Sequence, residues 1–274
     1  MSDRPLKLEI IKFESVTVDE HGLIVERREH SAQQVIEDLG KGVSLELVAI
    51  PGGTFRMGSP QGQGYDDERP LHTVRVAPFI MSRGPITQAQ WQAVMGALPA
   101  CRFSGPQRPV ENVAWHQARA FCERLSKSSR RAYRLPTESE WEYACRAESI
   151  TPFHFGPTIT TELANYNGEF TFLAEPKGVY RHHTTEAGSF PPNAFGLYDM
   201  HGNLWEWCAD AWHDDYVGAP TDGRPWATGD APCRVARGGS WHDTPQVCRS
   251  AVRLKCEANA GDELTGFRVA FSTI

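Results

Sequence analysis

Alternating apolar and polar positions open the chain and predict two strands. Residues 6–19, LKLEIIKFESVTVD, form the first predicted strand, and residues 23–32, LIVERREHSA, form the second. The DEHG segment between them predicts a turn, because Gly22 takes positive φ without steric cost. A hairpin of two strands buries little by itself. We therefore expect residues 1–42 to be a β-hairpin extension that packs on a domain formed by residues 43–274.

Three later segments have the apolar period of amphipathic helices. They are residues 87–96, residues 114–127 and residues 135–147. In the third segment Thr137 and Glu140 have the spacing of a capping box, in which each side chain bonds the backbone N–H of the other residue. On the second and third helices the residues expected to face the core are Ala118, Phe121, Cys122, Leu125, Trp141, Ala144 and Cys145.

Beyond Arg146 the pattern predicts no further helix. Short apolar runs at 196–210, 234–241 and 266–272 alternate with loops that are longer than usual. The chain has 24 Gly, 19 Pro and 8 Trp, which is typical of long ordered loops held by aromatic side chains. The prediction is an irregular α+β domain with little regular secondary structure.

Composition narrows the class of protein. The net charge of −6 gives no basic footprint for nucleic acid. No apolar run approaches the ~18 residues of a membrane span, and the N-terminus lacks the apolar core of a signal peptide. The seven cysteines are odd in number and form no CxxC pair, so we expect mostly free thiols and a cytoplasmic protein.

Seven short motifs follow one another along residues 43–272 of the sequence. They are IPGGTFRMGS, GPITQAQW, RPVENVAWHQARAFC, YRLPTESEWEYACRA, NAFGLYDMHGNLWEWCAD, RVARGGSW and GFRVAFS. Together, over residues 43–272, they closely resemble the formylglycine-generating enzyme family, also called the sulfatase-modifying factor family. The resemblance implies that family's fold, a large variant of the C-type lectin fold. Chemistry does not follow from the fold, because function depends on a site.

The resemblance places copper chemistry at the C-terminal segment. The family's oxidases hold copper with two cysteines that follow the aromatic residue of the GGS-aromatic turn. One cysteine lies two positions after that residue, and the other lies seven positions after it. Here the aromatic is Trp241, so Asp243 and Cys248 occupy those positions. Cu(I) prefers soft thiolates, and a carboxylate is a poor substitute. The alternative interpretation of Cys248 is a small buried apolar residue.

The resemblance also implies structural calcium, which prefers hard oxygen ligands. In DMHGNLWE the side chains of Asp199 and Glu206 and the carbonyls of Gly202 and Leu204 would bind the ion. The alternative is that Glu206 bonds only loop amides. A second site of the family begins at ANYN, which corresponds to Asn165 and Tyr166, but its usual acidic partner is not visible in the sequence.

Between RGGSW and GFRV the filler residues differ from those of the oxidases and show neither helical nor strand period. A subset of this fold serves diversity-generating retroelements, which randomise adenines in the codons of a C-terminal segment. Most filler residues are reachable from an AAC codon by such changes, but Lys255, Glu257 and Glu263 are not. The residues expected to bind a ligand are Trp241, His242, Asp243, Thr244, Gln246, Val247, Val252, Leu254, Cys256, Ala258, Asn259, Ala260, Asp262 and Leu264.

Two hypotheses follow. The first is a non-catalytic binding protein that displays residues 242–247 and 252–265 toward solvent, for a protein or other ligand, with Trp205, Trp207 and Phe267 buried beneath. The second is a copper-dependent oxidase that makes formylglycine in a sulfatase-like target, with Cys248 as the catalytic cysteine. An accessory domain that binds one fixed partner is a third interpretation. The replacement of a cysteine by Asp243 favours the first.

Overall fold

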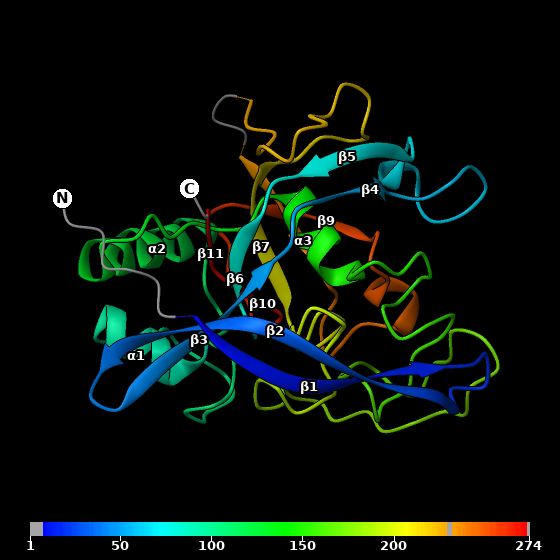
Figure 1. The fold of residues 1–274 in the computed structure, drawn as a ribbon, viewed down its shortest axis with the longest axis horizontal. Helices are drawn as coiled ribbons and strands as arrows, with labels where there is room; N and C mark the ends of the chain where they lie inside the picture. The colour runs from blue at the N-terminus through cyan, green and yellow to red at the C-terminus, as the bar shows by residue number, and fades with distance from the viewer. Residues whose placement is uncertain (1–7, 229–231, 273–274) are drawn as a thin grey trace.

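The computed structural model describes residues 8–228 and 232–272. The strands form three sheets, with the orders β1-β2-β3-β6-β11, β10-β7-β8-β9 and β4-β5 (Figure 1). The strands are β1 Glu9–Val18, β2 Ile24–Gly40, β3 Val43–Ile50, β4 Gly53–Met57, β5 His72–Val76, β6 Phe79–Ser82, β7 Trp205–Ala211, β8 Cys233–Arg237, β9 Arg253–Glu257, β10 Thr265–Gly266 and β11 Ala270–Ser272. The helices are α1 Gln88–Met95, α2 Trp115–Ser129 and α3 Glu138–Arg146, with 3-10 turns η1 Asp66–Glu68 and η2 Pro245–Cys248. The α+β prediction is therefore confirmed.

The N-terminal hairpin forms as predicted and is continuous with the rest of the fold. Gly22 has φ +77°, and its N–H donates to the Asp19 carbonyl at 3.1 Å. β2 runs beyond the predicted end at residue 32 and pairs with β3, with Gln34 opposite Val48. The extension is explained by Val35, which is buried in the core. Hairpin and domain thus share one sheet.

The three predicted helices are confirmed. The capping box of α3 is present, because Glu140 N–H donates to Thr137 Oγ1 at 3.1 Å and Thr137 N–H donates to Glu140 Oε2 at 2.8 Å. All the side chains expected on the buried faces of α2 and α3 are buried. From residue 147 onward, the described part of the chain contains no α-helix and only the short turn η2. No helix among residues 8–228 and 232–272 has the length and apolar character needed to cross a membrane.

Among the described residues, the buried apolar side chains form three clusters. One cluster joins α1 and α2 to Trp205, Trp207 and Phe267, which are 3 %, 0 % and 0 % exposed. The prediction that these three aromatic residues are buried is confirmed. Trp207 also donates its indole N–H to the Val113 carbonyl at 2.8 Å, so its polar atom is satisfied inside the core.

Two arginines of the C-terminal segment, Arg249 and Arg253, face inward and form ion pairs with carboxylates. Arg249 Nη2 lies 2.6 Å from Glu68 Oε1, and Arg253 Nε lies 2.6 Å from Glu138 Oε1. Burial opposes ionisation of Glu138, but the charges of Arg253 and Arg237, together with hydrogen bonds from Arg253 and Tyr216, outweigh it and lower the pKa of this carboxyl. The frame of the segment is therefore held to α3 and to the η1 turn by buried ion pairs, and breaking such pairs is costly.

The absence of strand period predicted for residues 252–265 is wrong. Residues 253–257 form β9, which pairs antiparallel with β8 along its whole length. Half-buried Leu254 and Cys256 alternate with exposed Lys255 and Glu257, whereas Arg253, which has the same strand parity as the two exposed residues, is buried at the start of the strand. The alternation covers only residues 254–257 and starts next to a charged residue, Arg253, whose burial depends on its ion pair with Glu138.

Candidate functional site

The RGGSW turn is tight because glycine backbone lies directly against other groups. Gly239 has φ +78°, and a Cβ there would lie 2.6 Å from Cys248 Sγ. Gly238 has φ +105°, with the Trp141 ring 3.1 Å from its hypothetical Cβ. Both conformations favour glycine. The turn therefore presents Trp241 and the residues after it in a fixed orientation.

Asp243, at the first copper position of the family, is bound into this turn. Its Oδ2 accepts hydrogen bonds from Ser240 N–H at 2.9 Å, from Ser240 Oγ at 2.6 Å and from Trp205 Nε1 at 2.8 Å. Burial raises the pKa of Asp243, although the Ser240 hydrogen bonds oppose the shift. The carboxylate thus closes the turn and ties it to the core.

Cys248, at the second copper position, is buried. Its side chain is 0 % exposed and belongs to an apolar cluster with Phe153 and Phe155. Burial raises the pKa of Cys248 well above that of a free thiol, which opposes thiolate formation. Its carbonyl accepts a hydrogen bond from His201 Nδ1 at 2.7 Å. This arrangement fits the interpretation of Cys248 as a small core residue.

A group of rings lies beside the RGGSW turn, with His182 and His242 exposed, Phe103 and Tyr180 half-buried, and Trp241 buried. We define the aromatic surface as Phe103, Tyr180, His182, Trp241 and His242. Tyr180 stacks on Trp241 with ring centroids 6.3 Å apart, and Phe103 meets Trp241 edge-on at 5.5 Å. The Tyr180 hydroxyl lies 2.6 Å from His242 Nδ1, and its ring lies 3.7 Å from that of His182. Rigid aromatic side chains with polar edges are the residues enriched at binding hot spots.

Three loops that are distant in sequence build the aromatic surface. Tyr180 follows a loop closed by the bond from Gly178 N–H to the Gly168 carbonyl at 2.8 Å. That loop is fastened to the C-terminal segment, because Asn167 N–H donates to the Asp243 carbonyl at 2.9 Å. Its exposed apolar residues are Phe170, Leu173 and Val179. Sequence reasoning missed Phe103, Tyr180 and His182, because no local pattern relates these positions to Trp241.

The residues predicted to bind a ligand do not all reach solvent. The exposed ones are His242, Asn259, Ala260 and Asp262, and the half-buried ones are Asp243, Thr244, Gln246, Val247, Leu254, Cys256 and Leu264. Val252 and Ala258 are 1 % and 4 % exposed, so the prediction that residues 252–265 face solvent is wrong at these two positions, and Trp241, predicted to bind a ligand, is 4 % exposed. Pro245 and Thr265 are buried as well. The reason is β9, whose ends place Val252 and Ala258 in the core.

The predicted calcium ligands lie in the loop that leads into β7. Asp199 is buried with φ +55°, and its Oδ2 accepts from Gly188 N–H at 2.7 Å while its Oδ1 has no hydrogen-bond partner among the described residues. Burial raises the pKa of Asp199 to about 6. An unpartnered buried carboxylate oxygen is suited to a hard cation. Asp199 therefore fits the prediction.

Glu206 has other partners. Its oxygens accept from Arg268 Nε at 2.5 Å and Arg268 Nη2 at 2.7 Å, and from Trp141 Nε1 at 2.7 Å. Both carboxylate oxygens are therefore already engaged, which fits the alternative of a structural role more closely than a free ligand. The carbonyl of Gly202 accepts from Leu204 N–H at 2.9 Å. Within the described ranges no group of three or more His, Cys, Asp or Glu side chains could hold a metal ion.

The second predicted calcium position adjoins the first. Asn165 pairs with Gly202 in an isolated parallel bridge, and its buried Oδ1 has no hydrogen-bond partner within the described part of the chain. Tyr166 is buried, and its hydroxyl donates to the Ile159 carbonyl at 3.0 Å. Asn165 thus offers a free oxygen, whereas the Tyr166 side chain is used by the core.

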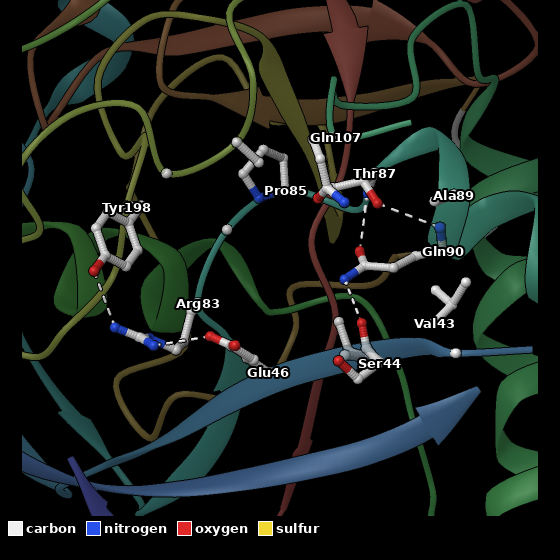
Figure 2. A pocket seen from close by; sticks show the side chains of 15 residues that line it. Val43, Ser44, Glu46, Arg83, Pro85, Thr87, Ala89, Gln90, Gln107 and Tyr198 are labelled. Carbon is white, nitrogen blue, oxygen red and sulfur yellow. Dashed lines mark hydrogen bonds and ion pairs between the residues drawn. The ribbon is translucent and has the colours of Figure 1, made fainter. Parts of the chain in front are cut away.

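A separate pocket of about 410 Å³ opens between β3 and α1. Figure 2 shows Arg83 on one wall between Glu46 and Tyr198, with bonds of 2.8 and 3.0 Å, and Gln90 on the other wall bonding the Ser44 carbonyl at 3.0 Å. None of the residues predicted as a site lines this pocket. We therefore take the aromatic surface as the candidate functional site.

The fold and the RGGSW frame define the class of protein, a C-type lectin scaffold of the formylglycine-generating type. The sulfatase-modifying factor enzyme 1-like domain matches residues 33–273, and the chain belongs to that family. It is 30 % identical to the formylglycine-generating enzyme of Thermomonospora curvata over 299 aligned positions, covering 85 % of this chain and 94 % of that enzyme. It is 32 % identical to the serine/threonine-protein kinase pkn1 of Chlamydia pneumoniae over 256 positions, covering 83 % of this chain but only 38 % of the kinase.

Two solved structures have the same fold. PvdO from Pseudomonas aeruginosa superposes with a TM-score of 0.77 at 34 % identity, covering 87 % of this chain and 98 % of that one. Treponema denticola variable protein 1 superposes with a TM-score of 0.75 at 26 % identity, covering 88 % and 99 %. The chain is thus similar both to proteins named as enzymes and to one named as a variable protein.

Proposed function

We propose that this chain is a non-catalytic ligand-binding protein that displays a variable C-terminal surface on a C-type lectin scaffold. The observation that carries the proposal is the state of the two copper positions. Asp243 accepts three hydrogen bonds that close the turn, and Cys248 is fully buried in an apolar cluster. A pair of accessible thiolates, which Cu(I) requires, is missing from these positions.

The aromatic surface supports binding as the activity. Half-buried Tyr180 and Phe103 each contact the buried ring of Trp241, so little side-chain entropy is lost when a ligand covers Tyr180 and Phe103. His242 and His182 add exposed polar edges. The ligand is a protein or another molecule with apolar and hydrogen-bonding groups. The similarity to a structure named as a variable protein is the reason for proposing a diversity-generating retroelement as the source of variation.

The display hypothesis is tested by the stability of surface variants. Combined substitution of His242, Asn259, Ala260 and Asp262 should change the free energy of unfolding by under ~0.5 kcal/mol per position, because these side chains are exposed. Val252→Ala is the matched control from the same segment, and it should cost about 2 kcal/mol because Val252 is buried. Large losses at most of the exposed positions in urea denaturation would reject a display surface.

The alternative is a copper-dependent formylglycine-generating oxidase. It is favoured by the 30 % identity to an enzyme of that name and by Cys248 at the second copper position. The assay is conversion of a cysteine-containing sulfatase peptide, with and without copper. We expect no product. Turnover by the unmodified protein that Cys248→Ala abolishes would replace the binding hypothesis with the enzyme.

The genetic source of variation has its own test. A reverse-transcriptase gene beside this one, with a near-copy of the codons for the C-terminal segment, would support the retroelement. Its absence would leave a binding protein with a fixed ligand.

We further propose that calcium is a structural cofactor through Asp199, in keeping with its unpartnered buried Oδ1. Asn165 Oδ1 is the free oxygen at the second position. Ion binding would need Glu206 to exchange at least part of its pairing with Arg268.

A further inference from the structure

β1 is an edge strand with an open outer side. It is the first strand in the five-stranded sheet and pairs only with β2. At one end the outer side is closed, because Val18 N–H donates to the Phe155 carbonyl at 2.8 Å. From Ile10 to Val16 no outward backbone bond to the rest of the described chain is present. Such an edge is a template for pairing with another strand.

The alternating direction of the backbone in β1 identifies which N–H and C=O groups point to the open side of the strand. Val18 points its N–H outward, and backbone direction alternates along an antiparallel strand. Ile10, Lys12, Glu14 and Val16 therefore present their N–H and C=O groups to the open side. Lys12 and Glu14 have exposed side chains, and Ile10 is 76 % exposed.

The charges on this edge complement each other in one register. Two copies of β1 that pair antiparallel must place outward residues opposite outward residues. A two-fold axis at Lys12 would put lysine opposite lysine, and an axis at Glu14 would put glutamate opposite glutamate, both of which are unfavourable. An axis at Phe13 puts Lys12 of each copy opposite Glu14 of the other.

The length of the open edge selects the same axis. The open segment runs from Ile10 to Val16, so Phe13 is its midpoint. With the axis there, Ile10 lies opposite Val16 at each end and the whole segment is paired. The two Phe13 residues then face each other as a close cross-strand pair, beside the ring of His30 on which Phe13 already stacks at 5.7 Å.

We propose that this chain forms a homodimer through its β1 edges, antiparallel and two-fold symmetric about Phe13, which joins two five-stranded sheets into one. The interface is isologous, as in most homodimers. Glu14 also accepts from Arg27 of its own β2 at 2.7 Å, and Lys12 has no ion-pair partner among the described residues, so a partner's Glu14 would satisfy it.

Charge reversal at Lys12 in one variant and at Glu14 in another tests the register of the two β1 strands. Lys12→Glu makes both positions acidic, and Glu14→Lys makes both basic. Each variant alone places like charges opposite each other and should weaken dimerisation at least about tenfold in sedimentation equilibrium. An equimolar mixture of the two variants should form a heterodimer, since the acidic edge then faces the basic one. Lys177→Glu, an exposed charge reversal outside β1, should leave the dimer intact.

Amide hydrogen exchange of the wild-type protein tests the same strand pairing without any substitution. Protection of the Ile10, Lys12, Glu14 and Val16 amides should rise with protein concentration, whereas the amides of Phe13 and Ser15, which face β2, should be protected throughout. A wild-type protein that stays monomeric over the full concentration series overturns the proposal. So does a dimer that neither single variant weakens, or a variant mixture that stays monomeric.

Discussion

The buried pair between Arg268 and Glu206 allows a sharp test of how the site is held. Both side chains are at most 1 % exposed, and the guanidinium meets both carboxylate oxygens. Arg268→Met keeps the approximate length of the side chain but removes the charge. Glu206 would then retain only the indole of Trp141 as a donor.

The expected loss is large because a charge is left buried without its partner. Removing one partner of a buried ion pair costs about 3–5 kcal/mol. For a domain of this size that corresponds to a fall in Tm of roughly 6–20 °C. The double variant Arg268→Met/Glu206→Gln should recover much of the loss, because no charge remains buried.

The assay is urea denaturation followed by circular dichroism, on the wild type, both single variants and the double variant. The four values form a double-mutant cycle for the pair. If Arg268→Met loses less than about 1 kcal/mol, the pair does not neutralise a buried charge. The reasoning about Glu206 would then be refuted.

Two further predictions concern the same region. His201 accepts from His154 N–H at 3.1 Å through Nε2 and donates through Nδ1 to the Cys248 carbonyl, so it is neutral. Burial lowers the pKa of His201 to about 4, below the unfolded value near 6.5. The contribution of neutral His201 to the free energy of unfolding is complete above pH 6.5, and about 3 kcal/mol of it is lost as the pH falls toward 4. In urea denaturation, His201→Gln should therefore show a flatter dependence of stability on pH between 6.5 and 4. Calcium in hundredfold excess over Kd should stabilise the protein by about 2.7 kcal/mol. Asp199→Asn should remove this stabilisation. Arg268→Met should be stabilised by calcium more than the wild type is, because Glu206 is then free to bind the ion. A melting temperature that responds to neither calcium nor chelator would exclude the site.

Local patterns in the sequence were sufficient for the elements that depend on neighbouring residues. The capping box of Thr137 and Glu140, the turn at Gly22 and the buried faces of α2 and α3 involve partners within a few positions, so periodicity and turn chemistry predict them. The RGGSW turn was also predictable, because its two adjacent glycines favour a tight turn, and both have positive φ in the structure.

Tertiary structure decided which residues form the candidate site. Phe103 and Tyr180 meet Trp241 across more than sixty positions, and no sequence period relates them. β9 was missed although Leu254 and Cys256 alternate with exposed Lys255 and Glu257, and only the tertiary structure buries its first residue, Arg253, against Glu138 on α3. Similarly, the local motif predicted Glu206 to be a metal ligand, but its carboxylate oxygens are paired with Arg268 in the folded chain. A charged residue is placed by the partner that compensates its burial, and that partner is known only once the chain has folded.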